Sequence, residues 1–150
     1  MNKERFVRRI LVPVDFSSCS ADALRFAHSL ASVLGATIEV VHVMDPSGTL
    51  LDPVADRPSG GDPVSARGLL RDFVAAVNSG SVPMTECIEH GDPYDRIVSL
   101  ATDEDFDLIV IVTHGRTGRL QALIGSVAES VVRTSPTPVL TVREVAKAGR

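Results

Sequence analysis

Hydrophobic and polar residues divide this chain into two kinds of segment that alternate from one end to the other. Short runs rich in aliphatic and β-branched residues, bounded by glycine or polar positions, are typical of strands buried in a sheet. Between these runs the apolar residues recur every three or four positions, which is typical of helices packed on that sheet. The predicted strands are Ile10 to Val14, Thr37 to Met44, Met84 to His90, Leu108 to Thr113 and Thr137 to Arg143.

The predicted helices fill the gaps between the strands. Their apolar faces are carried by Ala23 to Leu34, Ala66 to Val77, Ile97 to Ala101 and Val127 to Val132. Gly35 supplies a stop for the first helix, because glycine ends helices in the left-handed conformation. Gly61-Asp62-Pro63 and Gly91-Asp92-Pro93 each offer an aspartate cap followed by proline at the first helical position.

This alternation predicts an α/β fold, because right-handed crossovers between successive strands produce a parallel sheet covered on both faces. The 150 residues, of which 44% are hydrophobic, suffice for one globular domain with a real core. Ligands of such sheets bind at the carboxyl ends of the strands. That rule selects Asp15, Val43, Met44 and the stretch Val112 to Gly115.

Composition and charge exclude several classes of function. No apolar run approaches the roughly 20 residues that cross a bilayer, and no secretory signal precedes the first strand, so we expect a cytoplasmic protein without a membrane partner. A net charge of −4 argues against binding to nucleic acid, which requires a clustered basic surface. Cys19 and Cys87 lack the spacing of a metal site, and we expect two reduced thiols.

The stretch from Leu108 to Ser126 carries the most specific chemistry. An apolar strand ends in Thr113-His114-Gly115-Arg116-Thr117-Gly118, and Gly125-Ser126 then precedes a helix. Gly115 allows a sharp turn. The first-turn N–H groups and positive dipole end of the helix after Gly125 suit an anion. Strand, glycine loop and helix start together predict a phosphate-binding site.

The spacing of this site differs from the general nucleotide motifs. The chain has no Gly-x-x-x-x-Gly-Lys-Ser/Thr loop, and Gly115-Arg116-Thr117-Gly118 lacks the first half of a Gly-x-Gly-x-x-Gly turn. Instead, nine residues separate Gly115 from Gly125-Ser126, and with the flanking strands this spacing resembles the universal stress protein family. The resemblance covers nearly the whole chain and includes Ile10 to Ser17, Val41 to Asp45 and Gly91-Asp92-Pro93.

The resemblance implies an open five-stranded, Rossmann-like sheet similar to the adenine nucleotide alpha hydrolases. It also implies a stress-responsive sensor or regulator that binds ATP or another adenine nucleotide such as AMP, alone or together with Mg²⁺. In the nucleotide-binding branch the motif is Gly, two residues, Gly, nine residues, Gly and Ser/Thr. Gly115, Gly125 and Ser126 match the later elements, and Val112 stands where the family has its first glycine, beside the ribose and phosphates.

Two further positions correspond to ligand contacts in that family. Asp15 occupies the place of an acidic residue near the adenosine, and Val43 that of a residue whose backbone meets the adenine. The candidate nucleotide-binding residues are therefore Pro13, Asp15, Val43, Val112, His114, Gly115, Arg116, Gly125, Ser126 and Val127. Arg116 and Arg119 offer guanidinium groups to phosphates, although exposed loop arginines are more often directed to solvent.

The resemblance implies a homodimer joined through the last strand, Pro138 to Val142. An apolar edge strand exposes unpaired backbone groups unless another chain covers it. One branch of the family binds no nucleotide, so a nucleotide-free dimeric interaction module is the alternative function. A slow ATPase is the third, but it needs a residue that positions water, and Asp15 is the only nearby candidate.

Several residues also have simpler explanations. Asp15 is equally suited to cap the helix that begins near Ser18, and the long loop from Asp45 to Asp62 is either a lid or an unstructured excursion. His42, His90 and His114 lie near strand ends without metal-site spacing, so no metal is expected. Ser17, His114 and Asp15 lack the Gly-x-Ser-x-Gly elbow of a hydrolase, so no catalytic residue is assigned.

Overall fold

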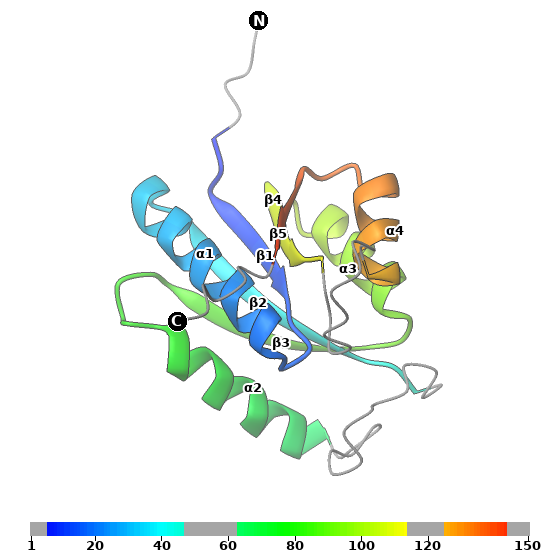
Figure 1. Ribbon diagram of the computed structural model, residues 1–150, viewed down its shortest axis with the longest axis horizontal. Coiled ribbons are helices and arrows are strands. Elements are labelled where there is room, and N and C mark those ends of the chain that lie inside the picture. The colour runs from blue at the N-terminus through cyan, green and yellow to red at the C-terminus, as the bar shows by residue number, and fades with distance from the viewer. Residues whose placement is uncertain (1–5, 47–62, 114–124, 144–150) are drawn as a thin grey trace, which may run out of the picture.

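Strands and helices alternate along the chain in the computed structural model, which describes residues 6–46, 63–113 and 125–143 (Figure 1). The strands in this part are β1 (Arg9–Pro13), β2 (Thr37–Met44), β3 (Met84–His90), β4 (Leu108–Val112) and β5 (Val139–Val142). The helices are α1 (Ser18–Leu34), α2 (Pro63–Val77), α3 (Pro93–Asp103) and α4 (Ser126–Thr134).

The five strands form one parallel sheet in the order β3-β2-β1-β4-β5. β1 and β4 lie at the centre, and Ile10 and Leu11 of β1 pair with Leu108 and Ile109 of β4. Along the chain, β2 and β3 are added on one side of β1. The chain then crosses through α3, and β4 and β5 are added on the other side of β1. The carboxyl ends of β1 and β4 therefore lie side by side at the point where the strand order reverses, which is where such sheets bind ligands.

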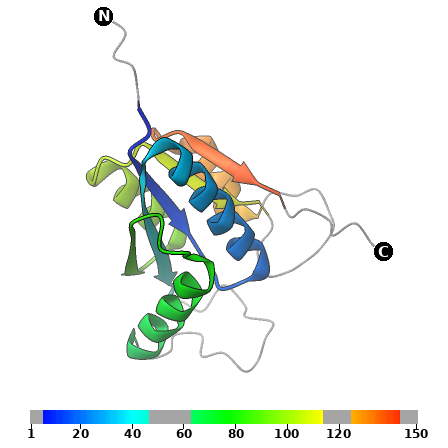
Figure 2. The same ribbon diagram turned by 90° about the vertical axis from the view of Figure 1, so that its left-hand side faces the viewer.

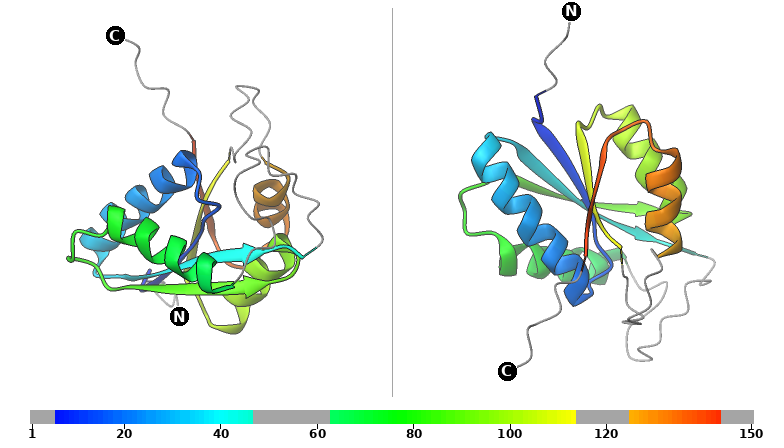
Figure 3. Two further views of the ribbon diagram at one scale, coloured as in Figure 1. Left: turned by 90° about the horizontal axis from the view of Figure 1, so that it is seen from below. Right: turned by 45° about the horizontal axis from the view of Figure 1, so that its top comes forward.

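Helices cover both faces of the sheet, as Figures 2 and 3 show. On one face α1 and α2 bury a core that contains Leu24, Leu70 and Val110. On the other face α3 and α4 bury a core around Ile97, Ile109 and Val131. The predicted α/β fold, an open five-stranded parallel sheet with helices on both faces, is confirmed.

The two edges of the sheet differ in chemistry. At one edge β3 is largely polar, with Thr85 and Glu86 exposed. At the other edge β5 contains Val139, Leu140 and Val142, which are half-buried against the two cores. The β4 strand between β5 and β1 is buried at all five positions, which explains its unbroken aliphatic sequence.

Most predicted element bounds are confirmed to within a residue, and Gly35 ends α1 in the left-handed conformation at φ 69°. The last strand is shorter than predicted. Before it the backbone is held in a turn, because the Ser135 hydroxyl accepts from the Thr137 amide at 3.1 Å and donates to the Thr137 carbonyl at 2.9 Å. Ladder pairing therefore begins only at Val139, opposite Ile109.

Both cysteines are free thiols, as predicted. Cys19 is buried, and Cys87 lies half-buried on β3. Burial, followed by the nearby carboxylates of Glu39 and Glu89, raises the pKa of the Cys87 thiol to about 11. In the described ranges, no helix has the length and apolar character needed to cross a membrane.

Candidate nucleotide-binding site

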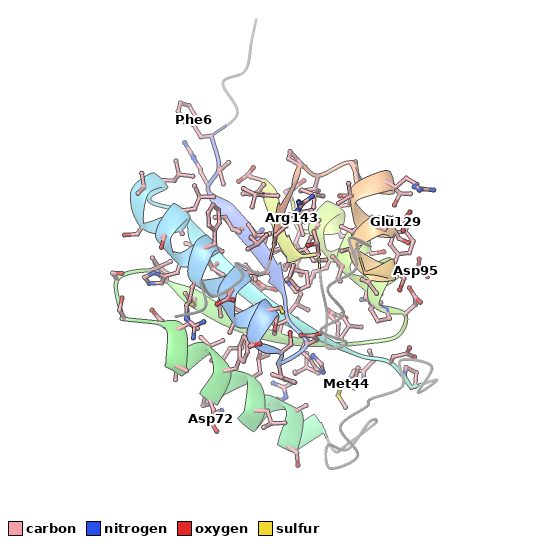
Figure 4. All side chains as sticks on the ribbon, in the orientation of Figure 1. Phe6, Met44, Asp72, Asp95, Glu129 and Arg143 are labelled. Carbon is pink, nitrogen blue, oxygen red and sulfur yellow. The ribbon has the colours of Figure 1, made fainter. Side chains whose placement is uncertain are left out.

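The predicted site residues that the structure describes lie at the carboxyl ends of the strands and at the start of α4. This carboxyl edge of the sheet is marked by Met44 at the end of β2, and Phe6 lies near the opposite edge (Figure 4). β1 and β4 end here beside each other. β1 leads into α1 on one face of the sheet, and β4 leads into α4 on the other face. The site is therefore built from the turn between β1 and α1, the end of β2, the end of β4 and the start of α4.

The turn between β1 and α1 positions Asp15. Its carboxylate oxygen Oδ1 accepts a hydrogen bond from the Ser17 amide at 3.0 Å and another from the Ser17 hydroxyl at 2.5 Å. The Ser17 hydroxyl oxygen in turn accepts from the Ser20 amide at 3.1 Å. Ser17 is thus the residue that caps α1, so the alternative prediction that Asp15 caps this helix is wrong. The aspartate instead closes a turn onto the capping serine.

Phe16, between Asp15 and Ser17, adopts a conformation that the sequence did not reveal. Its φ is 65°, in the left-handed region that bulky residues rarely occupy. The Phe16 ring contacts His42 of β2, with 4.4 Å between ring centroids, and Phe73 of α2 edge-on at 5.8 Å. His42 also anchors the turn, because its Nδ1 lies 2.9 Å from the Val14 carbonyl oxygen. Contacts from β2 and α2 therefore hold this backbone conformation.

Val43 lies where β2 extends past the end of β1. The Val14 amide donates to the Val41 carbonyl at 2.9 Å, and β1 turns away immediately afterwards. Backbone groups point alternately to the two sides of a strand, so the amide and carbonyl of Val43 point to the same side as those of Val41. At Val43 that side faces the region just beyond the end of β1. This direction suits the predicted contact between the Val43 backbone and an adenine ring.

At the end of β4, two backbone hydrogen bonds place the start of α4. The Thr113 amide donates to the Val142 carbonyl of β5 at 3.1 Å, and the Gly125 amide donates to the Thr113 carbonyl at 2.6 Å. Gly125 is therefore held next to the strand end although the intervening segment lies outside the described residues. Thr113 is 5% exposed. The sequence did not reveal this role of Thr113, because it is carried by the backbone amide and carbonyl and not by the side chain.

The start of α4 lacks the side-chain cap that the other two helices with described starts possess. Ser17 caps α1, and Asp92 caps α3 by accepting from the Asp95 amide at 3.0 Å. At α4 the capping position is Gly125, and within the described residues no side chain accepts from the first-turn amides. Because Gly125 is bonded to Thr113, those amides and the positive end of the helix dipole lie beside the end of β4, a position that suits a phosphate.

The predicted residues differ in how they are placed. Pro13 ends β1 in the buried layer, Val112 is 9% exposed in the core under α1, and Val127 packs on the opposite core. Gly125 is half-buried and Ser126 is exposed. Several predicted features lie outside the described residues: His114, Gly115, Arg116 and Arg119, the Asp62 cap, and 47–62 of the proposed lid.

A separate groove of about 340 Å³ lies between α3 and α4 and includes Ser126 at one end. Its polar groups bond to one another, since the Tyr94 and Thr134 hydroxyls lie 2.5 Å apart and Arg133 pairs with Glu129 at 2.8 Å. We therefore place the candidate anion site at the start of α4 rather than in this groove. Among the described residues, no group of three or more His, Cys, Asp and Glu side chains could hold a metal ion.

Comparison with known proteins gives a consistent result. A model of the universal stress protein family matches residues 7–143. Among curated proteins, universal stress protein MJ0531 of Methanocaldococcus jannaschii is 32% identical over 155 residues, covering 97% of this chain and 88% of the relative.

Solved structures extend this similarity to the fold. The structure of MJ0577, a universal stress protein of Methanocaldococcus jannaschii, has a TM-score of 0.78 at 26% identity and covers 93% of this chain and 98% of its own. A universal stress protein of Archaeoglobus fulgidus in complex with dAMP has a TM-score of 0.67 at 27% identity, with 91% and 98% covered. A universal stress protein in complex with cAMP has the same TM-score at 25% identity, with 91% and 97% covered.

Proposed function

The chain belongs to the universal stress protein family, and from that membership we propose that it binds ATP or AMP at the carboxyl edge of its sheet and acts as a stress-responsive sensor or regulator. The observation that carries this proposal is the start of α4. Its first-turn amides have no side-chain cap in the described part of the chain, whereas α1 and α3 are both capped. The complexes of two structural relatives with dAMP and cAMP support an adenine nucleotide as the ligand.

In this proposal each part of the nucleotide has its own partner. The phosphates accept hydrogen bonds from the backbone at Gly125, Ser126 and Val127, where helix dipole and amides act together. The adenine lies against the backbone of Val43, and the Asp15 carboxylate faces the sugar. Mg²⁺ would accompany ATP through the phosphate oxygens and water, the ligands this ion prefers.

The direct test is to identify what the protein binds. Small molecules released from the purified, denatured protein are identified by mass spectrometry, and titration calorimetry then measures the affinities of ATP, AMP and GTP. We expect a co-purifying adenine nucleotide, or tighter binding of ATP or AMP than of GTP. Protein that carries no nucleotide and binds none of the three would favour the nucleotide-free module. The ratio of ADP to ATP over time separates a binding protein from a slow ATPase.

We also propose that the protein is a homodimer joined through Pro138 to Val142. β5 is an outer strand of the described sheet. The carbonyl of Pro138, just before β5, accepts from the Ile109 amide, and the carbonyl of Val142 accepts from the Thr113 amide. Because backbone groups alternate along a strand, the amides of Val139 and Thr141 point away from β4. A second copy of this strand can pair with them around a two-fold axis.

The dimer is tested at Thr141, whose amide points away from the sheet. Thr141→Pro removes an outward donor without removing a bond to β4, and proline is tolerated on a sheet edge. Thr141→Val, which keeps the amide, is the matched control. Sedimentation at micromolar concentration should give a dimer for the parent and the valine variant and a monomer for the proline variant. A monomeric parent would contradict the proposal.

A further inference from the structure

We infer that Ser17 is a positioning residue for the nucleotide: it holds the Asp15 carboxylate in the orientation that meets the adenosine. The inference rests on the proposed nucleotide binding and adds to it a residue to which neither the family motif nor the sequence assigned a role in the ligand site. It differs from the structural role of Ser17 as the cap of α1, and the two roles are separable by experiment.

The geometry of the Asp15 carboxylate supports this role. One oxygen, Oδ1, accepts from both the amide and the hydroxyl of Ser17, at 3.0 and 2.5 Å. Two donors from one residue on one carboxylate oxygen restrict rotation of the side chain. Hydrogen bonds to an ionised carboxylate are also stronger than those between neutral groups. The second oxygen of Asp15 is thereby held in one place relative to the strand ends.

The Ser17 hydroxyl is itself held in a single hydrogen-bonding arrangement. Its oxygen accepts from the Ser20 amide at 3.1 Å, so its one proton is left for Asp15. Ser20 reinforces the arrangement by donating its own hydroxyl to the Ser17 carbonyl at 3.0 Å. The Ser20 side chain is 1% exposed, so this support is built into the core under the helix. Ser17 therefore connects the fixed start of α1 to the carboxylate.

The backbone between the two residues is fixed by other elements. Phe16 adopts a left-handed φ of 65°, which brings Ser17 back towards Asp15. A bulky residue retains such a conformation only when its surroundings hold it there. The contacts of its ring with His42 and Phe73 provide this restraint from β2 and α2. The orientation of Asp15 is thus set before any ligand arrives, which lowers the entropy lost on binding.

A double-mutant cycle tests the inference, with ATP affinity measured by calorimetry. Ser17→Ala should weaken binding about three- to tenfold in the parent protein, the size expected for the loss of a hydrogen bond that orients a charged group. In the Asp15→Ala background the same substitution should change the affinity less than twofold, because the group it positions is gone. Ser17→Thr, which keeps the hydroxyl, should restore the parent affinity.

Asp92→Ala provides the matched control for helix capping. It removes the side-chain cap of α3, as Ser17→Ala does at α1, but it leaves the turn at Asp15 intact. Both variants should melt at a lower temperature, and only Ser17→Ala should bind ATP more weakly. If Ser17→Ala weakens binding equally with and without Asp15, or not at all, the positioning role is excluded while nucleotide binding stands. If the parent protein binds no adenine nucleotide, the proposed function and this inference both fail.

Discussion

The connection from β1 to α1 and the connection from β4 to α4 begin side by side. The two helices nevertheless start in opposite ways. At α1 the Ser17 side chain accepts from the Ser20 amide of the first turn and also donates to Asp15. At α4 the cap position is Gly125, which offers no side chain. One connection thus presents a fixed carboxylate, and the other presents backbone donors.

In the proposed complex, this difference lets the carboxyl ends of the strands meet both ends of a nucleotide. The phosphates are anionic and need donors, a role that we propose for the start of α4. The sugar and base carry hydroxyl and amino groups and need acceptors, a role that we propose for Asp15 and the Val43 carbonyl. The two helix starts therefore offer complementary groups: an acceptor before α1 and backbone donors at α4.

The largest expected effect comes from Val112, the last residue of the strand that leads into α4. Its side chain is 9% exposed in the core beneath α1. Val112→Gly should therefore lower the free energy of unfolding by about 2–4 kcal/mol, from lost burial and added backbone entropy. Urea denaturation measures this loss, and a loss well below 1 kcal/mol would contradict the buried position.

The same variant tests whether Val112 restricts the ligand. A branched side chain at the place of the family's first glycine is predicted to crowd the ribose or phosphates at a cost of about 1–3 kcal/mol. Val112→Gly should then bind ATP about ten- to hundredfold more tightly, when calorimetry is performed where both proteins are folded. Equal affinities would mean that the core position of this side chain keeps it away from the ligand.

Gly125→Val should weaken phosphate binding at the start of α4. A branched side chain at the cap position blocks the close approach of phosphate to the amides, and we expect about thirtyfold weaker ATP binding, near 2 kcal/mol. The fold should survive, because Gly125 has φ −53° and ψ 145°, which any residue can adopt. Calorimetry measures the affinity, with the melting temperature as the control. An unchanged affinity would mean that the phosphates lie elsewhere.

At α1 the expected effect is on stability. Ser17→Ala should lower the free energy of unfolding by about 1 kcal/mol, the usual loss when a capping side chain is removed. Asp92→Ala should cost about the same at α3, because both residues accept from an amide three positions later. Urea denaturation of the two variants checks the comparison. A negligible loss at Ser17 alone would show that α1 does not depend on its cap.

The smallest effect should come from making α4 resemble α1. Gly125→Ser introduces a capping hydroxyl and should stabilise the fold by a few tenths of a kcal/mol, about the difference between serine and glycine at this position. The hydroxyl competes with phosphate for the same amides, so ATP affinity should fall while stability rises. Paired denaturation and calorimetry measure both changes. If both quantities rise together, the new hydroxyl binds the phosphate instead of replacing it.

The sequence predicted the fold because buried strands and amphipathic helices have distinct periods, and the fully buried β4 shows this most clearly. The strand order, with β1 beside β4, could not be read from any local pattern. Gly125 was identifiable from its spacing to Gly115. The bond from Ser17 to Asp15 was not, since it depends on the left-handed backbone of Phe16, which contacts from β2 and α2 hold. The sequence also left Asp15 as a candidate cap of α1, a role that Ser17 fills.

The contrasting edges of the sheet also bear on how large an assembly can grow. In the proposed dimer both apolar β5 edges are consumed, and the two outer edges of the joined sheet are β3 strands. These present the exposed Thr85 and Glu86, so bringing two such edges together would bring acidic side chains near each other. Growth by strand addition then stops at two subunits. If the proposed dimer forms, its acidic outer strands would protect the joined sheet from open-ended polymerisation.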